Sequence, residues 1–275
     1  MPSPSIPDSL ATLIEHARDA DGQSPFSDGA LVKLRIGGKR LLAFDQAAAI
    51  YSASEAELVV EPSERGKGIG TRLFEAVLER GDPGMKIWAH GDHPAARALA
   101  ASHGFEPVRR LLQLRAPVSA GLSFAASSAG RSSAAWSAGF RPGVDEDDWI
   151  ALNARAFASH PEQGSVTRAD LDELTAEPWF DPDDFLLLRD NHLLVGSCWL
   201  KIDGPVGEFY VVGVDPERQG GGLGRVLMDA GFARLAARGI RIAALYVESD
   251  NVPALALYHS LGFTEHSVDI QYARA

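Results

Sequence analysis

The sequence contains almost no cysteine, and it has fewer cationic than anionic side chains. Cys198 is the only cysteine among 275 residues, so an internal disulfide is excluded and the reducing cytoplasm is the expected compartment. The formal net charge of −11 argues against a general nucleic-acid partner or an anionic membrane surface. A compact anionic ligand is still compatible with this charge, because main-chain N–H groups can bind it locally.

Long apolar stretches are also missing. No segment reaches the roughly 20 apolar residues of a membrane-spanning helix. The N-terminal segment 1–19 carries acidic residues and lacks the apolar core of a signal peptide. We therefore expect a soluble cytoplasmic protein without a membrane partner. With 275 residues, the chain can form one large domain or two of ordinary size.

The sequence does contain an internal repeat, built around two glycine-rich turns. The two segments are ERGKGIGTRLF (64–74) and ERQGGGLGRVL (217–227), and each follows an apolar run and a proline. Each turn is followed by an apolar helical pattern, a strand-like run and a short helix that ends in Gly-Phe, at 104–105 and 262–263. Because this order of elements occurs twice, we predict two tandem α/β (α+β) domains.

A Ser-, Ala- and Gly-rich stretch separates the two copies. Residues 117–139 show little hydrophobic periodicity, which is typical of a linker. The predicted domains therefore cover 1–116 and 140–275. Two strand-like runs precede each turn, at 31–44 and 184–201, and each pair predicts a hairpin.

The two turns share the pattern R/Q-x-x-G-x-G, at Arg65–Gly70 and Gln219–Gly224. Neither has the spacing of a Rossmann fingerprint or of a Walker A loop. A glycine turn between a strand and a helix directs successive N–H groups at one point, where the helix dipole also favours negative charge. We therefore predict a pyrophosphate site at each turn. The alternative is a tight strand-to-helix turn without a ligand, and the presence of two copies argues against it.

A second motif follows the turn, N-x-x-A-x-x-x-Y-x-x-x-G-F, with Asn251, Ala254, Tyr258, Gly262 and Phe263. Turn and motif together resemble the GNAT superfamily of N-acetyltransferases, and both halves follow that family's order of elements. The resemblance implies two GNAT-type domains, each a mixed, mostly antiparallel sheet flanked by helices. It also implies acetyl-CoA as cosubstrate, with its pyrophosphate at the turn, and no metal.

The cofactor contacts implied by the resemblance fall in both copies. In the second domain they are Val212, Gly213, Val214, Gln219, Gly220, Gly221, Gly222, Leu223, Gly224, Arg225, Asn251, Val252, Pro253, Ala254, Leu255 and Ala256. In the first domain they are Leu58, Val59, Val60, Gly66, Lys67, Gly68, Ile69, Gly70 and Thr71.

Four further segments, AFASHPEQG (156–164), WFDP (179–182), GEFYVVGVDP (207–216) and LYVESDN (245–251), are similar to one tandem-domain branch of this family. That branch acetylates the cysteinyl amine of cysteinyl-glucosaminyl-inositol, so the likeness implies this small-molecule amine as the acceptor. The acceptor contacts that it implies are Asp28, Glu162, Lys201, Glu208 and Tyr246.

The two copies differ at the positions that matter for acetyl transfer. Counting back from the strand ends sets Glu208 opposite Ser54, and counting back from the Gly-Phe pairs sets Tyr258 opposite Ala100. An acceptor amine with a pKa of about 8 is mostly protonated at neutral pH, so transfer needs a base, and the departing thiolate needs an acid. We predict Glu208 as general base and Tyr258 as general acid. The first domain is then non-catalytic, and it holds acetyl-CoA as a structural ligand or holds nothing.

Other interpretations stay open at this point. Tyr258 also fits a core position on its helix, and Glu208 fits a solvated strand position. Another amine, such as an antibiotic, a polyamine or a protein amine, and a non-catalytic acetyl-CoA-binding regulatory protein are the rival functions. Cys198 lies in an apolar strand pattern and is not expected to act as a nucleophile, and His90 and His93 lack further metal ligands at suitable spacing. We expect a monomer.

Overall fold

The chain folds into two compact units. The computed structural model describes residues 6–118, 134–136, 139–158 and 161–274, so most of the predicted linker lies outside the described residues. The first unit contains Met1–Gln113, Glu248–Asp250 and His266–Ala275, and the second contains Leu114–Val247 and Asn251–Glu265. Within the described ranges, no helix has the length and apolar character to cross a membrane.

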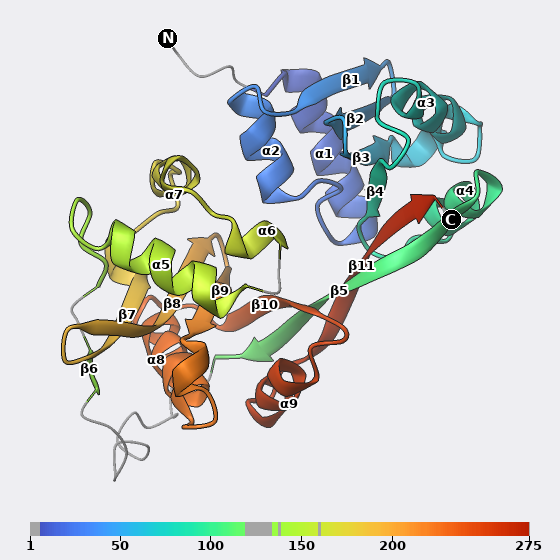
Figure 1. Cartoon of the computed structure of the whole chain (residues 1–275). Helices are drawn as coiled ribbons and strands as arrows, with labels where there is room; N and C mark the ends of the chain where they lie inside the picture. The colour runs from blue at the N-terminus through green and yellow to red at the C-terminus, as the bar shows by residue number, and fades with distance from the viewer. Residues whose placement is uncertain (1–5, 119–133, 137–138, 159–160, 275) are drawn as a thin grey trace. The chain divides into compact units, whose positions relative to one another are not determined.

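The first unit is a mixed sheet flanked by helices (Figure 1). Its strands follow the order β1-β2-β3-β4-β11-β5, in which β3 and β4 are parallel, while β1–β2, β2–β3 and β4–β11 are antiparallel. The strands are β1 (Arg40–Phe44), β2 (Ala47–Tyr51), β3 (Glu55–Val60), β4 (Lys86–Ala89), β5 (Phe105–Pro117) and β11 (Thr264–Arg274). The helices are α1 (Asp8–Asp21), α2 (Asp28–Arg35), η1 (Pro62–Glu64), α3 (Ile69–Leu78) and α4 (Pro94–Ser102).

The second unit repeats this plan. Its strands follow the order β5-β10-β9-β8-β7-β6, and β9–β10 is the parallel pair beside antiparallel neighbours. The strands are β6 (Ala134–Trp136), β7 (Phe185–Asp190), β8 (Leu193–Asp203), β9 (Val206–Val214) and β10 (Ile242–Glu248). The helices are α5 (Glu146–Ala156), α6 (Pro161–Gly164), α7 (Arg168–Thr175), η2 (Pro182–Asp184), η3 (Pro216–Arg218), α8 (Leu223–Ala237) and α9 (Val252–Ser260). The predicted fold class is confirmed.

One of the two predicted hairpins is wrong. The second forms as expected from β7 and β8, with Asn191 at a positive φ of 56° in the turn. In the first unit, however, the run at 31–35 is part of helix α2. The reason is the cap in front of it, because the Ser27 hydroxyl accepts a hydrogen bond from the Ala30 N–H at 3.2 Å. The hairpin forms later in the chain, between β1 and β2.

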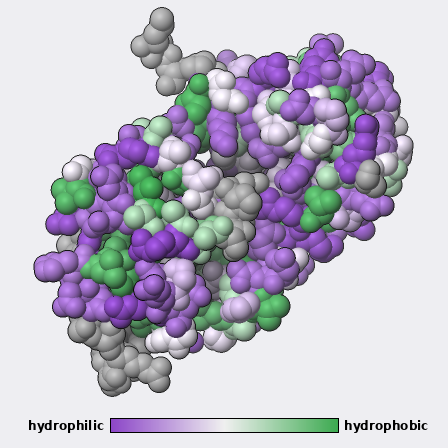
Figure 2. Space-filling view, in the orientation of Figure 1, coloured by the Kyte–Doolittle hydropathy of each residue, from purple (hydrophilic) through white to green (hydrophobic). Residues whose placement is uncertain are grey.

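Each unit has its own hydrophobic core. In the first, α3 buries Leu73, Phe74 and Val77 against the sheet. In the second, the rings of Phe185 and Trp199 stack with centroids 4.3 Å apart. The face of the molecule seen in Figure 2 is mostly hydrophilic, with hydrophobic residues scattered among polar ones.

The last strand of the chain belongs to the first unit. β11 follows α9 of the second unit, yet it pairs antiparallel with β4, with Ile270 opposite Ala89 and Tyr272 opposite Ile87. The expected division, which assigned all of 140–275 to the second domain, differs from this arrangement. Pairing between strands so distant in sequence leaves no local pattern from which it could be predicted.

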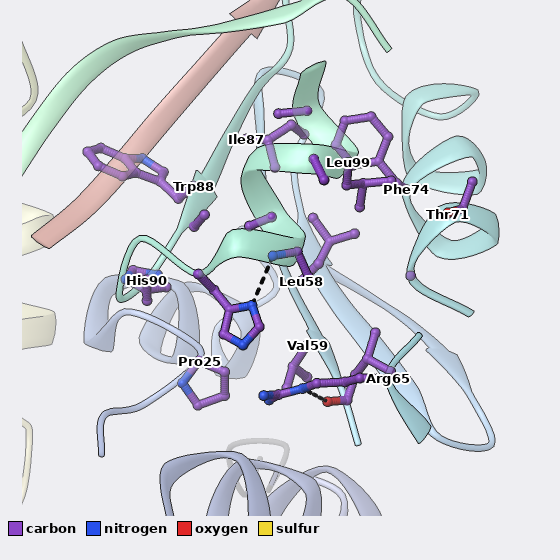
Figure 3. A pocket seen from close by; sticks show the side chains of 18 of the residues that line it. Pro25, Leu58, Val59, Arg65, Thr71, Phe74, Ile87, Trp88, His90 and Leu99 are labelled. Carbon is purple, nitrogen blue, oxygen red and sulfur yellow. Dashed lines mark hydrogen bonds between the residues drawn. The ribbon is translucent and has the colours of Figure 1, made fainter. Parts of the chain in front are cut away.

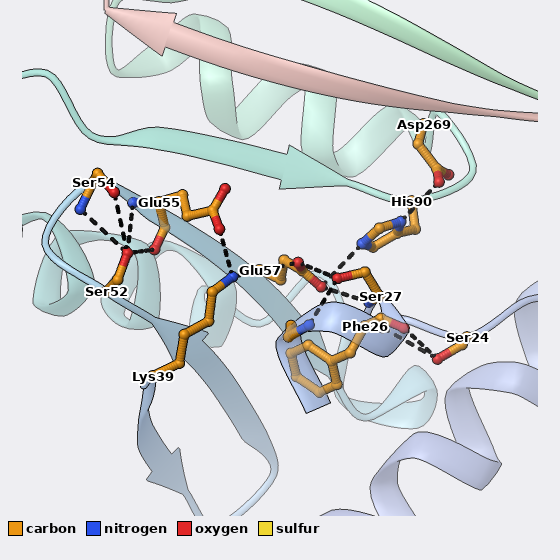
Figure 4. Close-up of polar contacts among 11 residues, drawn as sticks. Ser24, Phe26, Ser27, Lys39, Ser52, Ser54, Glu55, Glu57, His90 and Asp269 are labelled. Carbon is orange, nitrogen blue, oxygen red and sulfur yellow. Dashed lines mark hydrogen bonds and ion pairs between the residues drawn. The ribbon is translucent and has the colours of Figure 1, made fainter. Parts of the chain in front are cut away.

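A buried ionic cluster holds β11 in the first unit (Figure 4). His90 Nδ1 lies 3.0 Å from an Asp269 oxygen, and His90 Nε2 lies 3.2 Å from a Glu57 oxygen. The other Glu57 oxygen accepts a hydrogen bond from the Ser27 hydroxyl at 2.7 Å. Burial by itself lowers the pKa of His90, but the hydrogen bonds and charges of Asp269 and Glu57 outweigh it and raise the pKa to about 10. The imidazole is therefore a buried cation between two carboxylates.

This raised pKa predicts how the stability of the first unit depends on pH. The folded state binds more protons than the unfolded state between the ordinary His pKa of 6.5 and about 10. The contribution of His90 is therefore fully present below pH 6.5 and is lost as the pH rises through about 10. Thermal melts across this range should show a steeper loss of stability in the wild type than in His90→Gln. Equal slopes would contradict the charged state of His90.

Candidate active site

The two glycine turns have the same backbone geometry. Gly66 and Gly68 have φ values of 77° and 76°, and Gly220 and Gly222 have values of 77° and 83°. These left-handed conformations favour glycine, because a Cβ atom would strain them. The side chain of the first residue in each turn donates a hydrogen bond to the main-chain carbonyl at the end of the preceding strand. Arg65 Nε donates to the Val60 carbonyl at 3.2 Å, and Gln219 Nε2 donates to the Val214 carbonyl at 3.4 Å.

A parallel strand pair diverges just before the turn of the second unit. The paired residues of β9 and β10 run from Val206 and Ile242 to Phe209 and Leu245. β9 then continues to Val214 beyond the last of these pairs. The residues predicted to bind the cofactor through main-chain groups, Val212–Val214, lie in this continuation.

Helix α9 lies beside this turn, and its apolar side chains are only partly covered by the rest of the protein. Asn251 caps it by accepting a hydrogen bond from the Ala254 N–H at 3.2 Å. None of its residues is fully buried although the segment is strongly apolar, and Val252 is 69% exposed. A Cβ atom on Gly224 would lie 3.3 Å from the Leu257 side chain, so the glycine allows α8 and α9 to approach closely. The predicted cofactor residues of turn and helix are thus brought together.

Tyr258, the predicted acid, lies on the same helix. Its ring is 5.9 Å from that of Phe263, which in turn lies 6.0 Å from the ring of Phe209 on β9. Burial, with a smaller contribution from Cys198, raises the pKa of Tyr258 to about 12. The phenol therefore keeps its proton throughout the neutral range and can donate it.

The strand register corrects the predicted counterpart of Glu208. Trp199 pairs with Val211 and Leu200 pairs with Phe209, so Tyr210 is the extra residue of a β-bulge. The first unit has no such shift in the described β2–β3 pair. With this bulge, Glu208 corresponds to Glu55 and not to Ser54. Counting along the sequence assumed strands of equal length, and the prediction that the first domain lacks a carboxylate here is wrong.

Two of the predicted acceptor-binding residues lie directly opposite each other. Glu208 pairs in register with Lys201, so both side chains project from the same face of the sheet. Lys201 is 7% exposed, and its ammonium lies 5.3 Å from the centre of the Trp179 ring. The Trp179 ring also contacts Tyr210 at 5.3 Å. No role was predicted for these two aromatic residues, although Trp179 belongs to the WFDP segment (179–182).

The other three predicted acceptor contacts lie on other elements than Lys201 and Glu208. Tyr246 lies on β10, two residues beyond the Ala244 that pairs with Glu208, and it is 42% exposed. Its position on the strand gives it the same face as Glu208. Asp28 begins helix α2 of the first unit. Glu162 lies in α6, and its side chain is outside the described part of the structure.

Known proteins match both halves of the chain. The sequence profile described as "Acetyltransferase (GNAT) family" matches residues 149–263, and the profile described as "Acetyltransferase (GNAT) domain" matches residues 28–107. The mycothiol acetyltransferase of Clavibacter michiganensis subsp. michiganensis is 47% identical over 291 residues, which cover 100% of this chain and 93% of the relative. That of Thermobispora bispora is 44% identical, covering 99% and 97%.

The chain belongs to the mycothiol acetyltransferase family of GNAT enzymes. It is therefore an acyltransferase, and acetyl-CoA is the cosubstrate of its family. Solved structures agree on the fold. A GCN5-related N-acetyltransferase from Sphaerobacter thermophilus has a TM-score of 0.72 at 21% identity, covering 96% of this chain and 91% of that one. A tandem GNAT protein from the clavulanic acid biosynthesis pathway has a TM-score of 0.71 at 16% identity, covering 97% and 93%.

The first GNAT unit has a cavity at the corresponding place. It has a volume of about 560 Å³ and is lined by strand residues Val59 and Val60, turn residues Gly66 and Gly68, and Ala100 of α4 (Figure 3). The predicted cofactor-binding residues Leu58, Gly70 and Thr71 also line it. The carboxylate that corresponds to Glu208, Glu55, forms an ion pair with the buried Lys39 at 2.8 Å.

Cys198 does not have the character of a catalytic nucleophile. It is fully buried on β8, and burial raises the pKa of its thiol. A thiol of raised pKa carries little thiolate, which is the nucleophilic form. This agrees with the interpretation of Cys198 as a core residue.

Alanine substitutions at two neighbouring glycines test the backbone conformation of the second turn. Gly222 has a φ of 83°, whereas Gly221 lies outside the left-handed region, and a Cβ atom there would make an ordinary contact. We expect Gly222→Ala to lower the free energy of unfolding by about 1–2 kcal/mol because of backbone strain. Gly221→Ala should stay within about 0.5 kcal/mol. Denaturant titrations measure both values, and equal losses would contradict the assigned backbone.

Proposed function

We propose that the second unit transfers the acetyl group of acetyl-CoA to the cysteinyl amine of cysteinyl-glucosaminyl-inositol, which yields mycothiol. The observation that carries this proposal is the 47% identity to a mycothiol acetyltransferase over the whole chain. The diverging strands β9 and β10, the glycine turn and the phenol of Tyr258 support it, because together they provide what direct transfer from a CoA thioester requires.

The cosubstrate fits the second turn by its chemistry. A pyrophosphate is a compact dianion, and the first N–H groups of α8 follow the positive-φ glycines Gly220 and Gly222, at the helix end that favours negative charge. The main-chain groups of Val212–Val214 can pair with the amides of the pantetheine arm as an added strand would. The exposed apolar residues of α9, including Val252, supply the other wall.

Glu208 serves as the general base. The acceptor amine attacks the thioester carbonyl only when it is neutral, and its proton then passes to a carboxylate, directly or through a water. The strand position of Glu208 beside the divergence supports this role. Glu208 is paired in register with the buried Lys201, so a base and a cation lie on the same face of the sheet.

Tyr258 serves as the general acid. As the tetrahedral intermediate collapses, the C–S bond breaks and the sulfur of CoA takes a proton. Burial raises the pKa of Tyr258 to about 12, so the phenol still carries its proton when the thiolate departs. Phe209 packs against Phe232 of α8, so the neighbouring Glu208 projects from the opposite face of the sheet. We infer that base and acid approach the reacting carbonyl from opposite sides.

The acceptor is expected to lie along the face formed by Lys201, Glu208 and Tyr246. Hydroxyl groups of a sugar and an inositol can hydrogen-bond to these side chains, and the Trp179 ring beside Lys201 offers an apolar edge. Glu162 and Asp28 are further proposed contacts.

Direct product analysis tests the proposed reaction. The purified protein is incubated with acetyl-CoA and cysteinyl-glucosaminyl-inositol, and acetylated acceptor is measured by mass spectrometry, because the acceptor's own thiol disturbs thiol-release assays. We expect one acetyl group on the cysteinyl nitrogen. Polyamines and aminoglycosides serve as competing amines, and a faster reaction with any of them would contradict the assigned acceptor.

Variants at the two catalytic positions test the mechanism. We expect Glu208→Gln and Tyr258→Phe each to lower kcat by roughly 10²–10⁴-fold, because each removes one proton transfer from the rate-limiting chemistry. The matched control is Glu55→Gln, which changes the corresponding carboxylate of the first unit and should leave kcat unchanged. A kcat loss in the control as large as that in Glu208→Gln would place the chemistry elsewhere.

A further inference from the structure

One aromatic ring of the second unit contacts both the bulge of β9 and the cation opposite Glu208. Trp179 lies between α7 and η2 and is only partly buried. Its ring centroid lies 5.3 Å from that of Tyr210, the bulge residue, and 5.8 Å from that of Trp199. The Lys201 ammonium lies 5.3 Å from the centre of the same ring. Trp179 therefore connects the aromatic core of this unit with a side chain of the proposed acceptor face.

The side chains that this ring contacts lie on one face of the sheet. Lys201 follows Trp199 by two residues on β8, so both project to the same side. β8 has one residue between these two, whereas β9 has two residues between their partners Val211 and Glu208. The ring of Tyr210 packs 5.5 Å from that of Trp199, so the bulge residue also projects to this side. The bulge thus adds an aromatic side chain beside the Lys201–Glu208 pair.

Core contacts fix the orientation of the Trp179 ring. Trp199 is fully buried, stacks on Phe185, and lies edge-on to Trp149 at a centroid distance of 5.7 Å. Trp179 is inclined by 43° to Trp199 and by 60° to Tyr210. Inclined pairs of this kind are favourable, because the edge of an aromatic ring is positive and its face is negative. A ring held by two neighbours offers its face to a cation in one orientation.

The position of Lys201 makes this ring face important. Its side chain is mostly buried, and removing an ammonium from water is costly unless other groups meet its charge. The face of a tryptophan ring attracts a cation, and the attraction is strongest where the cation is desolvated. The stem of lysine is flexible and by itself allows the ammonium many positions. The Trp179 ring therefore favours one of these positions, on the face of the sheet that carries Glu208.

We propose that Trp179 is a positioning residue of the acceptor site, which holds the ammonium of Lys201 where it donates hydrogen bonds to hydroxyl groups of the acceptor. An ammonium has only N–H donors, so its position decides which hydroxyl oxygens it can reach. The ring takes no part in either proton transfer, so its loss weakens acceptor binding and leaves the chemical step intact. This inference rests on the proposed function, because Lys201 meets the acceptor only if the acceptor lies along this face.

A double-mutant cycle between Trp179 and Lys201 tests the inference. In the full-length protein, Trp179→Leu should lower kcat/KM for cysteinyl-glucosaminyl-inositol about tenfold, as expected for loss of a desolvated cation–π contact. Both kcat and the KM for acetyl-CoA should stay within about twofold, because lost acceptor binding raises only the acceptor's KM. In the Lys201→Met background, the same substitution should change kcat/KM by less than about twofold. Acetylated acceptor is measured by mass spectrometry.

Phe180→Leu is the matched control. The Phe180 ring packs on Trp199 with centroids 5.8 Å apart and on Phe140 with centroids 6.3 Å apart. The substitution removes a ring from the same aromatic cluster and keeps the ring beside Lys201, so kcat/KM should stay within about twofold. Thermal melting identifies a Trp179→Leu protein that fails to fold. The cycle is then run with Trp179→Phe, whose smaller ring should cost about threefold in kcat/KM, and this loss should vanish in the Lys201→Met background.

The outcomes separate this inference from the proposed function. A Trp179 effect that vanishes in the Lys201→Met background supports the inference. Losses that multiply in the double variant, or a loss in Phe180→Leu equal to that in Trp179→Leu, indicate general packing and overturn it, while acetylation of the acceptor by the wild type leaves the proposed function standing. Absence of acetylated acceptor with the wild type overturns the proposed function and this inference with it.

Discussion

The divergence of one parallel strand pair in each unit is the feature on which the site architecture depends. A paired β-strand uses its N–H and C=O groups within the sheet, so it has none to offer to a ligand. β9 extends beyond its last pair with β10, and β3 extends beyond its last pair with β4. In both units a turn with two positive-φ glycines comes next and begins a helix. Strand edge, turn and helix start therefore follow one another directly in both units.

The two units differ in the strand register and in the side chains around the turn. In the second unit a bulge at Tyr210 shifts the strand so that Glu208 lies opposite the buried Lys201, and α9 supplies Tyr258. In the first unit the strand runs without that shift, the corresponding Glu55 is tied to Lys39, and α4 has Ala100 in place of the phenol. The same backbone thus carries different side chains around the turn in the two copies.

The buried cluster of the first unit shows how a strand from the far end of the chain is secured. Asp269 on β11 forms an ion pair with one ring nitrogen of His90, and the other ring nitrogen pairs with Glu57 on β3. Removing one member of such a cluster would leave a charge buried without a partner, which is costly. Charge satisfaction therefore specifies which strand completes this sheet, in addition to the apolar contacts of Ile270 and Tyr272.

Several parts of this protein could be predicted from the sequence alone. The glycine turns, the helices behind them and the Gly-Phe elements were predictable because their patterns are local and occur twice. The placement of Tyr258 on α9 was predictable in the same way, since helix positions can be counted without insertions. Only the tertiary structure identified the counterpart of Glu208, because no sequence pattern shows that a β-bulge adds a residue to β9. It alone also decided the membership of β11 and the cluster around His90, which arise from contacts between segments that are far apart in the chain. The helix at 31–35 has a local cause, the Ser27 cap, which the prediction of a hairpin there overlooked.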